Sequence, residues 1–261
     1  PVSIVAAVVP TDYEAPGVKD FWDPLIGSGA FAITRPALLM VVAGGLVIWF
    51  LLATTKQKAL VPSKGQMATE AVYGLVRNGI ARDLIGSKEF LRFVPLLFSL
   101  FMIILVNNIF GVLPPFSFPA MSRIGLPIAL TLIVWITFHA VGMRKHGFVG
   151  YFKSLVPSGL PGWIVPVIFF LELITDLFTR PVTLALRLFG NMFAGHLLLV
   201  LFITGGYYLL TSGGILSVAG GVTWIFAFVM FLFELLVEFL QAYVFTLLAA
   251  LYIAGAVADS H

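Results

Sequence analysis

Arg187 lies in the run Phe178–Asn191, between long stretches of almost uncharged apolar sequence. An arginine side chain keeps its proton under the conditions found in proteins. Placing that charge at membrane depth costs at least ~3 kcal/mol. A chain that keeps it there uses the charge, or neutralises it with a partner. The residues one helical turn away are Thr183 and Asn191, so we expect a partner of Arg187 to lie on another helix or another chain.

Polar residues recur around this arginine at intervals of three or four along one segment. They are Glu172, Asp176, Arg180, Thr183, Arg187 and Asn191. A straight helix turns about 100° per residue, so these positions are predicted to share one face. Asp176 precedes Arg180 by four residues, an order that favours a structural ion pair. Pro181 removes a backbone hydrogen bond and predicts a kink near Leu177.

A second polar face is predicted on the last apolar segment of the chain. It carries Glu234, Glu238, Gln241 and, further along, Tyr252. Carboxyl groups at this depth favour the protonated, neutral form because a bare charge is costly to bury, which makes them candidate stations for a proton. His196 can exchange a proton near neutral pH. It is nine residues beyond Arg187, so the two face different aqueous regions unless the helix bends at a glycine between them.

Each of these positions also has a purely structural interpretation. Asn191 and Gln241, taken singly, are equally well explained by an interhelical hydrogen bond. Asn107 and Asn108 either cap the end of a helix or form local hydrogen bonds. His139 stands alone within its predicted span and is interpreted as a packing residue. The sequence shows no Gly-rich nucleotide loop, Ser/His/Asp set or metal-ligand spacing, so we expect no cofactor, metal or nucleic acid.

The composition identifies the setting of these residues. Of the 261 residues, 60% are hydrophobic and only 10% are charged, whereas a soluble domain has about 25% charged residues. The apolar runs are long and continuous rather than alternating, which argues against a membrane β-barrel and for helices. The absence of cysteine removes disulfides and thiolate metal sites. We therefore predict an all-α integral membrane protein.

About five membrane-crossing helices are expected, the last two long and tilted, because they exceed the ~20 residues of one perpendicular crossing. The predicted organisation is an extracytoplasmic lead at 1–35, a first span at 36–53, a basic cytoplasmic segment at 54–92, a helical hairpin at 93–143, a cytoplasmic loop at 144–162, and two long helices carrying the polar residues at 163–261. Within the basic segment, residues 63–88 form either an interfacial amphipathic helix or a solvated linker helix.

Basic residues predict the orientation of the chain in the membrane. They concentrate in 54–92 and 144–162. Basic loops stay in the cytoplasm, so we expect the N-terminus outside and, after five crossings, the C-terminus inside. No clean internal repeat is visible, so the inverted-repeat architecture of many secondary transporters gains no support.

Three sequence runs resemble one known family. Leu186–His196, which reads LRLFGNMFAGH, closely resembles the signature of subunit a of F-type ATP synthases. Leu240–Phe245, which reads LQAYVF, looks like the second signature of that subunit. Asn107–Pro114, which reads NNIFGVLP, resembles the segment that closes its second span. The resemblance covers most of residues 60–258.

This resemblance implies a function and a set of partners. The family member is a stator subunit that is not catalytic alone but belongs to the H⁺-transporting complex. It conducts protons through two offset half channels to and from the carboxylates of a rotating c-ring. Peripheral-stalk b-type subunits and membrane lipid are its further partners. A bacterial plasma membrane is the expected location.

The resemblance also implies roles for individual residues. Arg187 matches the essential arginine that separates the half channels, and Asn191 and Gln241 match polar residues beside it. His196 and Glu234 match a pair at which relatives carry a histidine and an acid in either order. Glu172, Arg180 and Thr183 match further polar positions of the family, earlier on the same helix. Gly111 stands where some relatives have an acid, so the outer path is expected to use Glu234, Glu238 and His196, and the role of Asn108 is left open.

Two other functions are compatible with buried polar residues. A stand-alone proton-coupled transporter would use the same acids, but it would need a substrate cavity, and the sequence shows no broken-helix pair that could form one. A non-conducting scaffold would use the polar faces only to hold helices together.

Overall fold

The structure is a computed structural model that describes residues 24–26, 33–55, 63–87, 89–113, 120–156 and 161–258. Most of the predicted N-terminal lead lies outside these residues. The part that is described contains two short antiparallel strands, β1 (Pro24–Ile26) and β2 (Ile33–Thr34). Everything else of regular structure in the described ranges is helical, so the predicted all-α membrane fold is confirmed.

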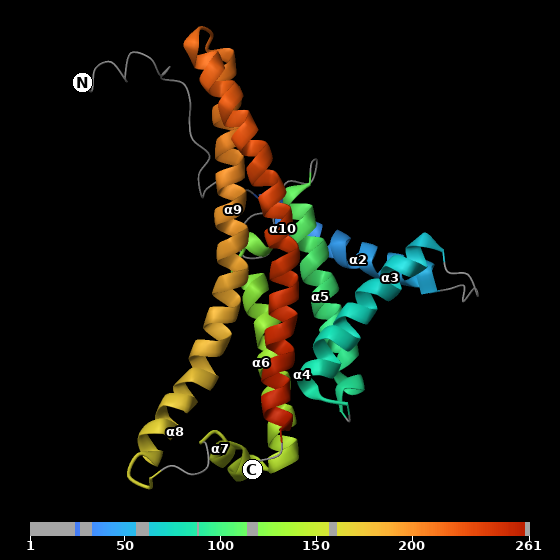
Figure 1. Ribbon diagram of the computed structural model, residues 1–261, viewed down its shortest axis with the longest axis vertical. Coiled ribbons are helices and arrows are strands. Elements are labelled where there is room, and N and C mark those ends of the chain that lie inside the picture. Colours follow the sequence, from blue (N-terminus) through green and yellow to red (C-terminus); the bar gives the residue numbers. More distant parts are fainter. Residues whose placement is uncertain are drawn as a thin grey trace.

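Helix α2 (Arg35–Thr55) coincides with the predicted first span. Its apolar part, Leu38–Thr54, is shorter than the other apolar helices. It contacts α5 and leaves the bundle at a steep angle to α10 (Figure 1). Four longer helical stretches are apolar and long enough to cross a membrane: 90–112, 125–146, 165–211 and 215–257. The described part of the chain therefore holds four candidate spans and one shorter apolar helix.

The predicted amphipathic helix is present as one helical segment. It consists of α3 (Lys64–Gly74), the π-helical η2 (Leu75–Arg82) and α4 (Asp83–Ile85), and Ser63 caps its start. Its apolar residues Val76, Ile80 and Ala81 are fully buried against the bundle, mainly on α5. This packing explains the helical spacing of apolar residues in the sequence. Its interfacial position in the membrane stays a prediction.

The region predicted as a helical hairpin contains two helices, α5 (Phe90–Val112) and α6 (Gly125–His146), with the short helix η3 (Ala120–Ser122) before α6. Both helices pack against the long helices that follow them rather than against each other. The predicted cytoplasmic loop contains a further short helix, α7 (Phe148–Ser154), which folds back against α6. The main apolar core lies between α5, α6 and α10, with Leu97, Phe101, Val134 and Phe138 among its buried residues.

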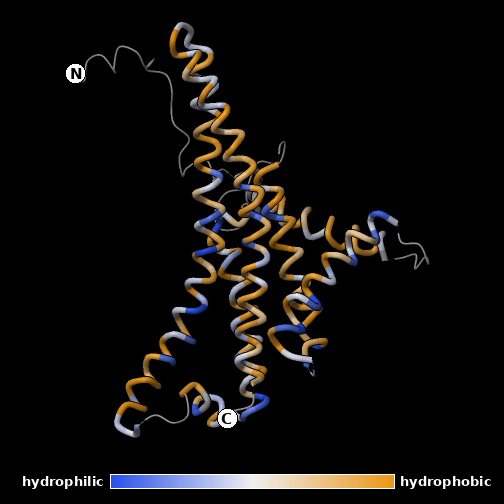
Figure 2. Tube along the Cα trace, viewed as in Figure 1, coloured by the Kyte–Doolittle hydropathy of each residue, from blue (hydrophilic) through white to orange (hydrophobic). Residues whose placement is uncertain are grey.

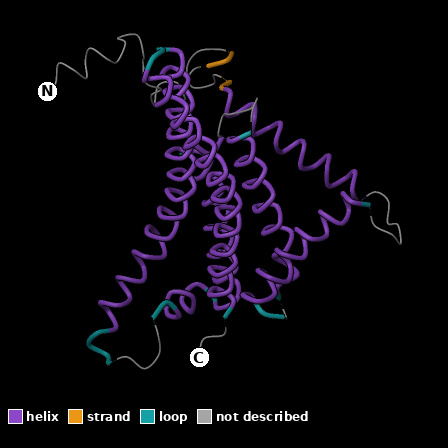
Figure 3. The backbone as a smooth tube through the Cα atoms, turned by 45° about the horizontal axis from the view of Figure 1, so that its top comes forward, coloured by secondary structure: helices purple, strands orange, loops and turns teal. Residues whose placement is uncertain are grey.

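The two long predicted segments are two long helices that lie side by side (Figures 1 and 3). The first consists of α8 (Val165–Ile174), the π-helical η4 (Thr175–Thr179) and α9 (Arg180–Thr211), and it spans 47 residues. The second is α10 (Ile215–Val257), with 43 residues. Gly213 and Gly214 both have positive φ, which allows the tight turn between them.

The α9–α10 pair diverges at one end and packs closely at the other. At the turn end, a Cβ on Gly220 would lie 2.5 Å from the backbone nitrogen of Leu210, so only glycine permits this approach. At the opposite end α8 swings away from α10 (Figure 1). Hydrophilic positions gather in the middle part of this pair, on helices that are otherwise mainly hydrophobic (Figure 2).

Candidate functional site

The π-helical turn η4 determines which polar residues of the long helix face inward. Pro181 has no N–H, and its ring would collide with the carbonyl of Leu177 in a regular α-helix. The chain widens into a π-turn over Thr175–Thr179, where the sequence predicted a kink. A π-turn adds a residue to the turn and shifts the phase of the residues after it.

The predicted single polar face on this helix is therefore wrong in one respect. Asp176 is buried at 1% exposure, whereas Thr183, Arg187 and Asn191 are exposed. Glu172 lies one turn before Asp176 and is partly buried, and it has no hydrogen bond or ion pair with any residue in the described ranges. The stripe divides into an inward acid and an outward set that contains the arginine.

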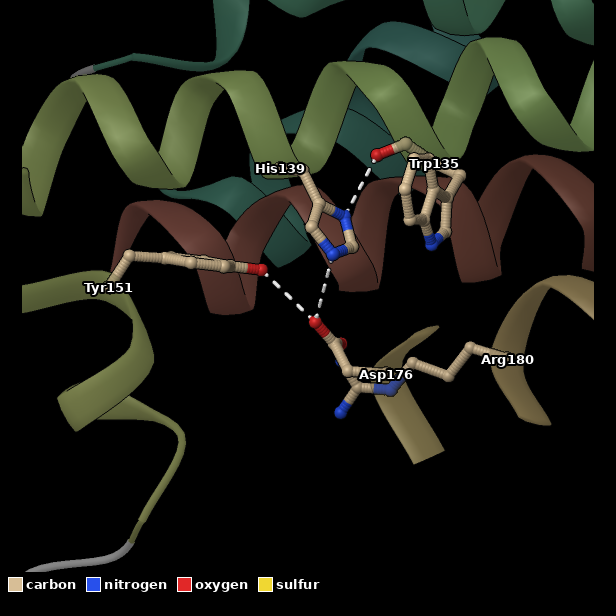
Figure 4. A network of polar contacts seen from close by, with 5 residues as sticks. All are labelled: Trp135, His139, Tyr151, Asp176 and Arg180. Atoms are coloured by element: carbon tan, nitrogen blue, oxygen red, sulfur yellow. Dashed lines mark hydrogen bonds and ion pairs between the residues drawn. The ribbon is translucent and has the colours of Figure 1, made fainter. Parts of the chain in front are cut away.

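Around Asp176 four side chains from separate elements meet in what we call the Asp176 cluster: His139, Tyr151, Asp176 and Arg180 (Figure 4). The hydroxyl of Tyr151 donates to Oδ2 of Asp176 at 3.1 Å. Nε2 of His139 lies 3.4 Å from the same oxygen. Arg180 forms an ion pair through Nη1 with Oδ1. His139 therefore has a charged neighbour, and its interpretation as an isolated packing residue was wrong.

Tyr151 reaches the cluster because α6 carries a glycine opposite its ring. A Cβ on Gly142 would lie 2.3 Å from Cε2 of Tyr151, so a larger residue would displace the ring. Burial raises the pKa of the Tyr151 phenol, and the neighbouring Asp176 carboxylate raises it further. The phenol therefore stays a neutral hydrogen-bond donor. Tyr252 lies on the other side of Arg180, whose Cζ is 5.3 Å from the centre of the Tyr252 ring.

Arg187 differs from Arg180 in having no partner of this kind. Its side chain is exposed, and it forms no hydrogen bond or ion pair with any residue that the structure describes. One turn later, Nδ2 of Asn191 donates to Oε1 of Gln241 on α10 at 2.8 Å. One turn earlier, Thr183 donates to the carbonyl oxygen of Thr179 at 2.6 Å. Both neighbouring side chains thus donate hydrogen bonds to other groups, and the Arg187 guanidinium is free to contact an acid outside this chain.

A second group of polar side chains, the Glu238 cluster, lies where α5, α9 and α10 meet. Its members are Asn108, His196, Glu234 and Glu238, all of them buried. The carboxyl groups of Glu234 and Glu238 hydrogen-bond to each other. Nδ2 of Asn108 donates to the backbone oxygen of Glu238 at 3.4 Å. Among the described residues, Oε2 of Glu238 has no hydrogen-bond partner.

The Glu234 carboxyl group fits against α9 because the facing residue there is a glycine, Gly195. A Cβ on Gly195 would lie 2.1 Å from Oε1 of Glu234. The next residue, His196, hydrogen-bonds to the backbone of Gly111 on α5. His196 is buried while Arg187 is exposed. The two side chains therefore face different sides of the helix, as their spacing predicts.

Sequence reasoning missed His139, Tyr151, Gly142 and Gly195. His139 and Gly142 are three residues apart and so share a face of α6, which was a readable signal. Nothing in the sequence spacing shows that Tyr151, in a predicted loop, folds back onto that face.

Taken together, the fold and the site define a multi-pass helical membrane protein in which titratable side chains line the contact between two long helices. Residues 37–254 match the protein family described as ATP synthase A chain, and the chain belongs to this family.

Named relatives support this assignment over nearly the whole length. The ATP synthase subunit a of a Nocardioides species is 45% identical, over 99% of this chain and 98% of the relative. That of Pseudarthrobacter chlorophenolicus is 44% identical over 96% of each. That of Streptomyces lividans is 38% identical over 95% of this chain and 89% of the relative. The chain is thus a proton-translocating subunit of the membrane sector, and its partners are the other subunits of that sector.

Proposed function

We propose that the chain is the stator against which a ring of carboxylate-bearing subunits turns, and that Arg187 separates two half channels. The observation that carries this proposal is the contrast in charge compensation on α9. Arg180 is paired with Asp176, whereas Arg187 is exposed without an acid among the described residues. An uncompensated guanidinium at this depth is costly unless an outside acid meets it.

The mechanism follows from the charge of a passing carboxyl group. In lipid a ring carboxyl stays protonated, because a bare charge there is costly. Opposite Arg187 its ionised form is favoured by the fixed positive charge. The same charge repels a free proton and prevents direct passage between the half channels. The ring must therefore turn for a proton to cross, driven by ~2.3 kcal/mol per charge per 100 mV.

The two clusters suggest the two half channels. The Glu238 cluster, with two acids and an imidazole, supports a path on the side of the α9–α10 turn. The Asp176 cluster, with Thr183 and Glu172 nearby on the same long helix, supports a path on the side of α7 and the C-terminus (Figure 1). Gln241 and Asn191 lie between them, beside Arg187, and hold α9 and α10 together there.

The partner surface is the exposed apolar face beside Arg187. Its side chains are Val182, Leu186, Leu236, Phe239 and Leu240, each at least 43% exposed. Such a face suits the apolar outer wall of a ring and would leave Arg187 within reach of each passing carboxylate. The b-type stalk subunits are the other proposed partners. The proposed location is a bacterial plasma membrane. The positive-inside rule supports an orientation with α7 and the C-terminus in the cytoplasm.

Replacing Arg187 in the complete reconstituted complex tests this proposal. Arg187→Ala is expected to abolish ATP synthesis driven by a proton gradient. Arg187→Lys is expected to be poor too, because a lysine enclosed between this chain and the ring can lose its proton. Arg82→Gln is the matched control, since Arg82 is an exposed cation on another helix. Normal synthesis in Arg187→Ala would refute the role.

The orientation has its own test. The chain contains no cysteine, so a single Cys introduced at Ala258 is unique in this subunit. Labelling of that Cys by a membrane-impermeant reagent only from the cytoplasmic side is the expected result.

A further inference from the structure

The imidazole of His139 lies between a backbone carbonyl oxygen and a carboxylate, and neither of these groups can donate a hydrogen bond. Nδ1 is 3.0 Å from the backbone oxygen of Trp135, one turn earlier on α6. Nε2 is 3.4 Å from Oδ2 of Asp176 on η4. Apart from that contact, Nε2 is buried with no hydrogen-bond partner among the described residues. Figure 4 shows the ring bridging the two oxygens.

These contacts constrain the protons on the ring. A carbonyl oxygen cannot donate, so the 3.0 Å contact places a hydrogen on Nδ1. A neutral ring would then turn the lone pair of Nε2 toward Oδ2 of Asp176. Two acceptors would face each other in a buried site, which is unfavourable. A proton on Nε2 removes this conflict, because an imidazolium donates from both nitrogens.

The charged and titratable groups around His139 come from every element packed against it there. Asp176 belongs to η4, Arg180 to α9, Tyr151 to α7, and Tyr252 lies on α10 against Phe138 and Arg180. Asp176 and Arg180 compensate each other, and Tyr151 is a neutral donor. Oδ1 of Asp176 pairs with Arg180, and Oδ2 faces Tyr151 and His139, so Oδ2 is the oxygen that a proton on Nε2 of His139 would contact.

We propose that His139 and Asp176 together bind one exchangeable proton, carried on Nε2 of His139 and stabilised by Oδ2 of Asp176. Its place in transport rests on the proposed function. In that function, a proton released from a ring carboxyl group passes the Thr183–Arg180 side of α9 and forms an N–H bond at Nε2 of His139. When that bond breaks, the proton leaves to water at the α7 end. His139 is thereby a further residue of the path on the cytoplasmic side.

The protonation state of His139 can be measured directly in the complete complex. The subunit would be labelled with nitrogen-15 histidine, reconstituted in lipid and studied by solid-state NMR, with the His139→Gln variant assigning the signals. We expect two protonated ring nitrogens for His139 near neutral pH. In Asp176→Asn we expect a neutral ring, because the counter-charge is gone. A neutral His139 in the native complex, or an imidazolium that persists unchanged in Asp176→Asn, would overturn the proposal.

A transport measurement separates a proton-binding role from mere packing. ATP-driven proton pumping by His139→Gln would be measured while the pH on the α7 side is varied around the ordinary histidine pKa of ~6.5. We expect the pH dependence in this range to flatten, whereas a packing defect would lower the rate equally at every pH. Tyr151→Phe is the comparison, because it removes one bond to Asp176 and leaves the imidazole; it should keep the pH dependence.

Failure of this inference is distinguishable from failure of the proposed function. Normal ATP synthesis in Arg187→Ala would refute the role of Arg187 and leave the nitrogen spectrum of His139 unchanged. A neutral His139 would refute the proton site and leave the role of Arg187 intact.

Discussion

The two polar clusters that flank Arg187 differ in how their buried carboxyl groups are compensated. The Asp176 cluster surrounds one carboxylate with a guanidinium, a phenol and an imidazole. The Glu238 cluster brings two carboxyl groups together, with amide groups and an imidazole but no arginine or lysine among its described neighbours. An acid paired with a cation can stay ionised when buried, whereas two adjacent acids cannot both be ionised without a large cost.

The difference indicates a division of labour. In the Asp176 cluster the ion pair of Asp176 with Arg180 and the contacts of Asp176 with Tyr151 and His139 hold α6, α7 and α9 together. In the Glu238 cluster the carboxyl groups must hold protons to remain buried, so protons can be gained and lost. Arg187 lies between the clusters and belongs to neither. Loss of Asp176 should therefore cost more stability than loss of a carboxyl group in the Glu238 cluster, while the proton proposed on His139 gives the Asp176 cluster a part in proton flux as well.

The largest expected effect on stability is that of Asp176→Ala. It leaves Arg180 without its acid, and breaking a buried ion pair costs about 3–5 kcal/mol. The lower part of this range applies because the Arg180 side chain is 33% exposed. Thermal unfolding of the detergent-solubilised complex measures it. Asp176→Asn also removes the charge but keeps an acceptor for Tyr151, so the ion-pair account predicts a loss close to that of Asp176→Ala. A loss near zero in Asp176→Asn would contradict that account.

Glu234→Gln tests the other side of the comparison. It removes a carboxyl group that can carry a proton and keeps its shape. Positioned proton-transfer groups contribute on the order of 10²-fold or more to rate. We expect ATP synthesis to fall by about that factor while the unfolding temperature stays near that of the native complex. If stability fell and flux per assembled complex did not, Glu234 would be a structural residue and not a proton carrier.

Gly195→Ala is expected to act on the same carboxyl group by steric means. The new Cβ would overlap the carboxyl end of Glu234, and this flexible side chain would have to swing away from α9. The displaced carboxyl should lower proton flux in vesicles. Gly190→Ala is the matched control, because no atom lies within 4 Å of a Cβ there. Similar losses in both variants would show that helix α9 tolerates neither change and that the Glu234 contact is not the cause.

The smallest effect is expected between the clusters. Asn191 and Gln241 share one hydrogen bond across α9 and α10, and such bonds in membrane proteins average ~0.6 kcal/mol. A double-mutant cycle with Asn191→Ala and Gln241→Ala measures this coupling from unfolding in detergent. A coupling several times larger would mean that this pair contributes far more to the contact between α9 and α10 than one hydrogen bond in a membrane protein usually does.

The comparison also shows what the sequence could predict. The face of α10 that carries Glu234, Glu238 and Gln241 was predicted correctly, because α10 is a regular helix and spacing alone fixes its faces. The face of the preceding helix was predicted only in part. Pro181 signalled a distortion, but its form, a π-turn, and the contacts of Asp176 with His139 on α6 and Tyr151 on α7 are visible only in the structure.

The partners of Asp176 were beyond prediction for a related reason. His139 is 37 residues earlier on another helix and Tyr151 is 25 residues earlier on a short helix in a predicted loop. Only the tertiary arrangement brings them together. By contrast, the spacing of Arg187 relative to Thr183 and Asn191 was enough to predict that its partner lies off its own helix, and the described structure shows no partner within this chain.

The most direct test of the account measures passive proton flux and ATP synthesis in the same vesicles, with the native complex and with Arg187→Ala. If the guanidinium separates two otherwise intact half channels, the variant will make no ATP while protons still cross the membrane sector. Synthesis that continues in step with proton flux in Arg187→Ala would contradict the central claim, because the separation would then not depend on this charge.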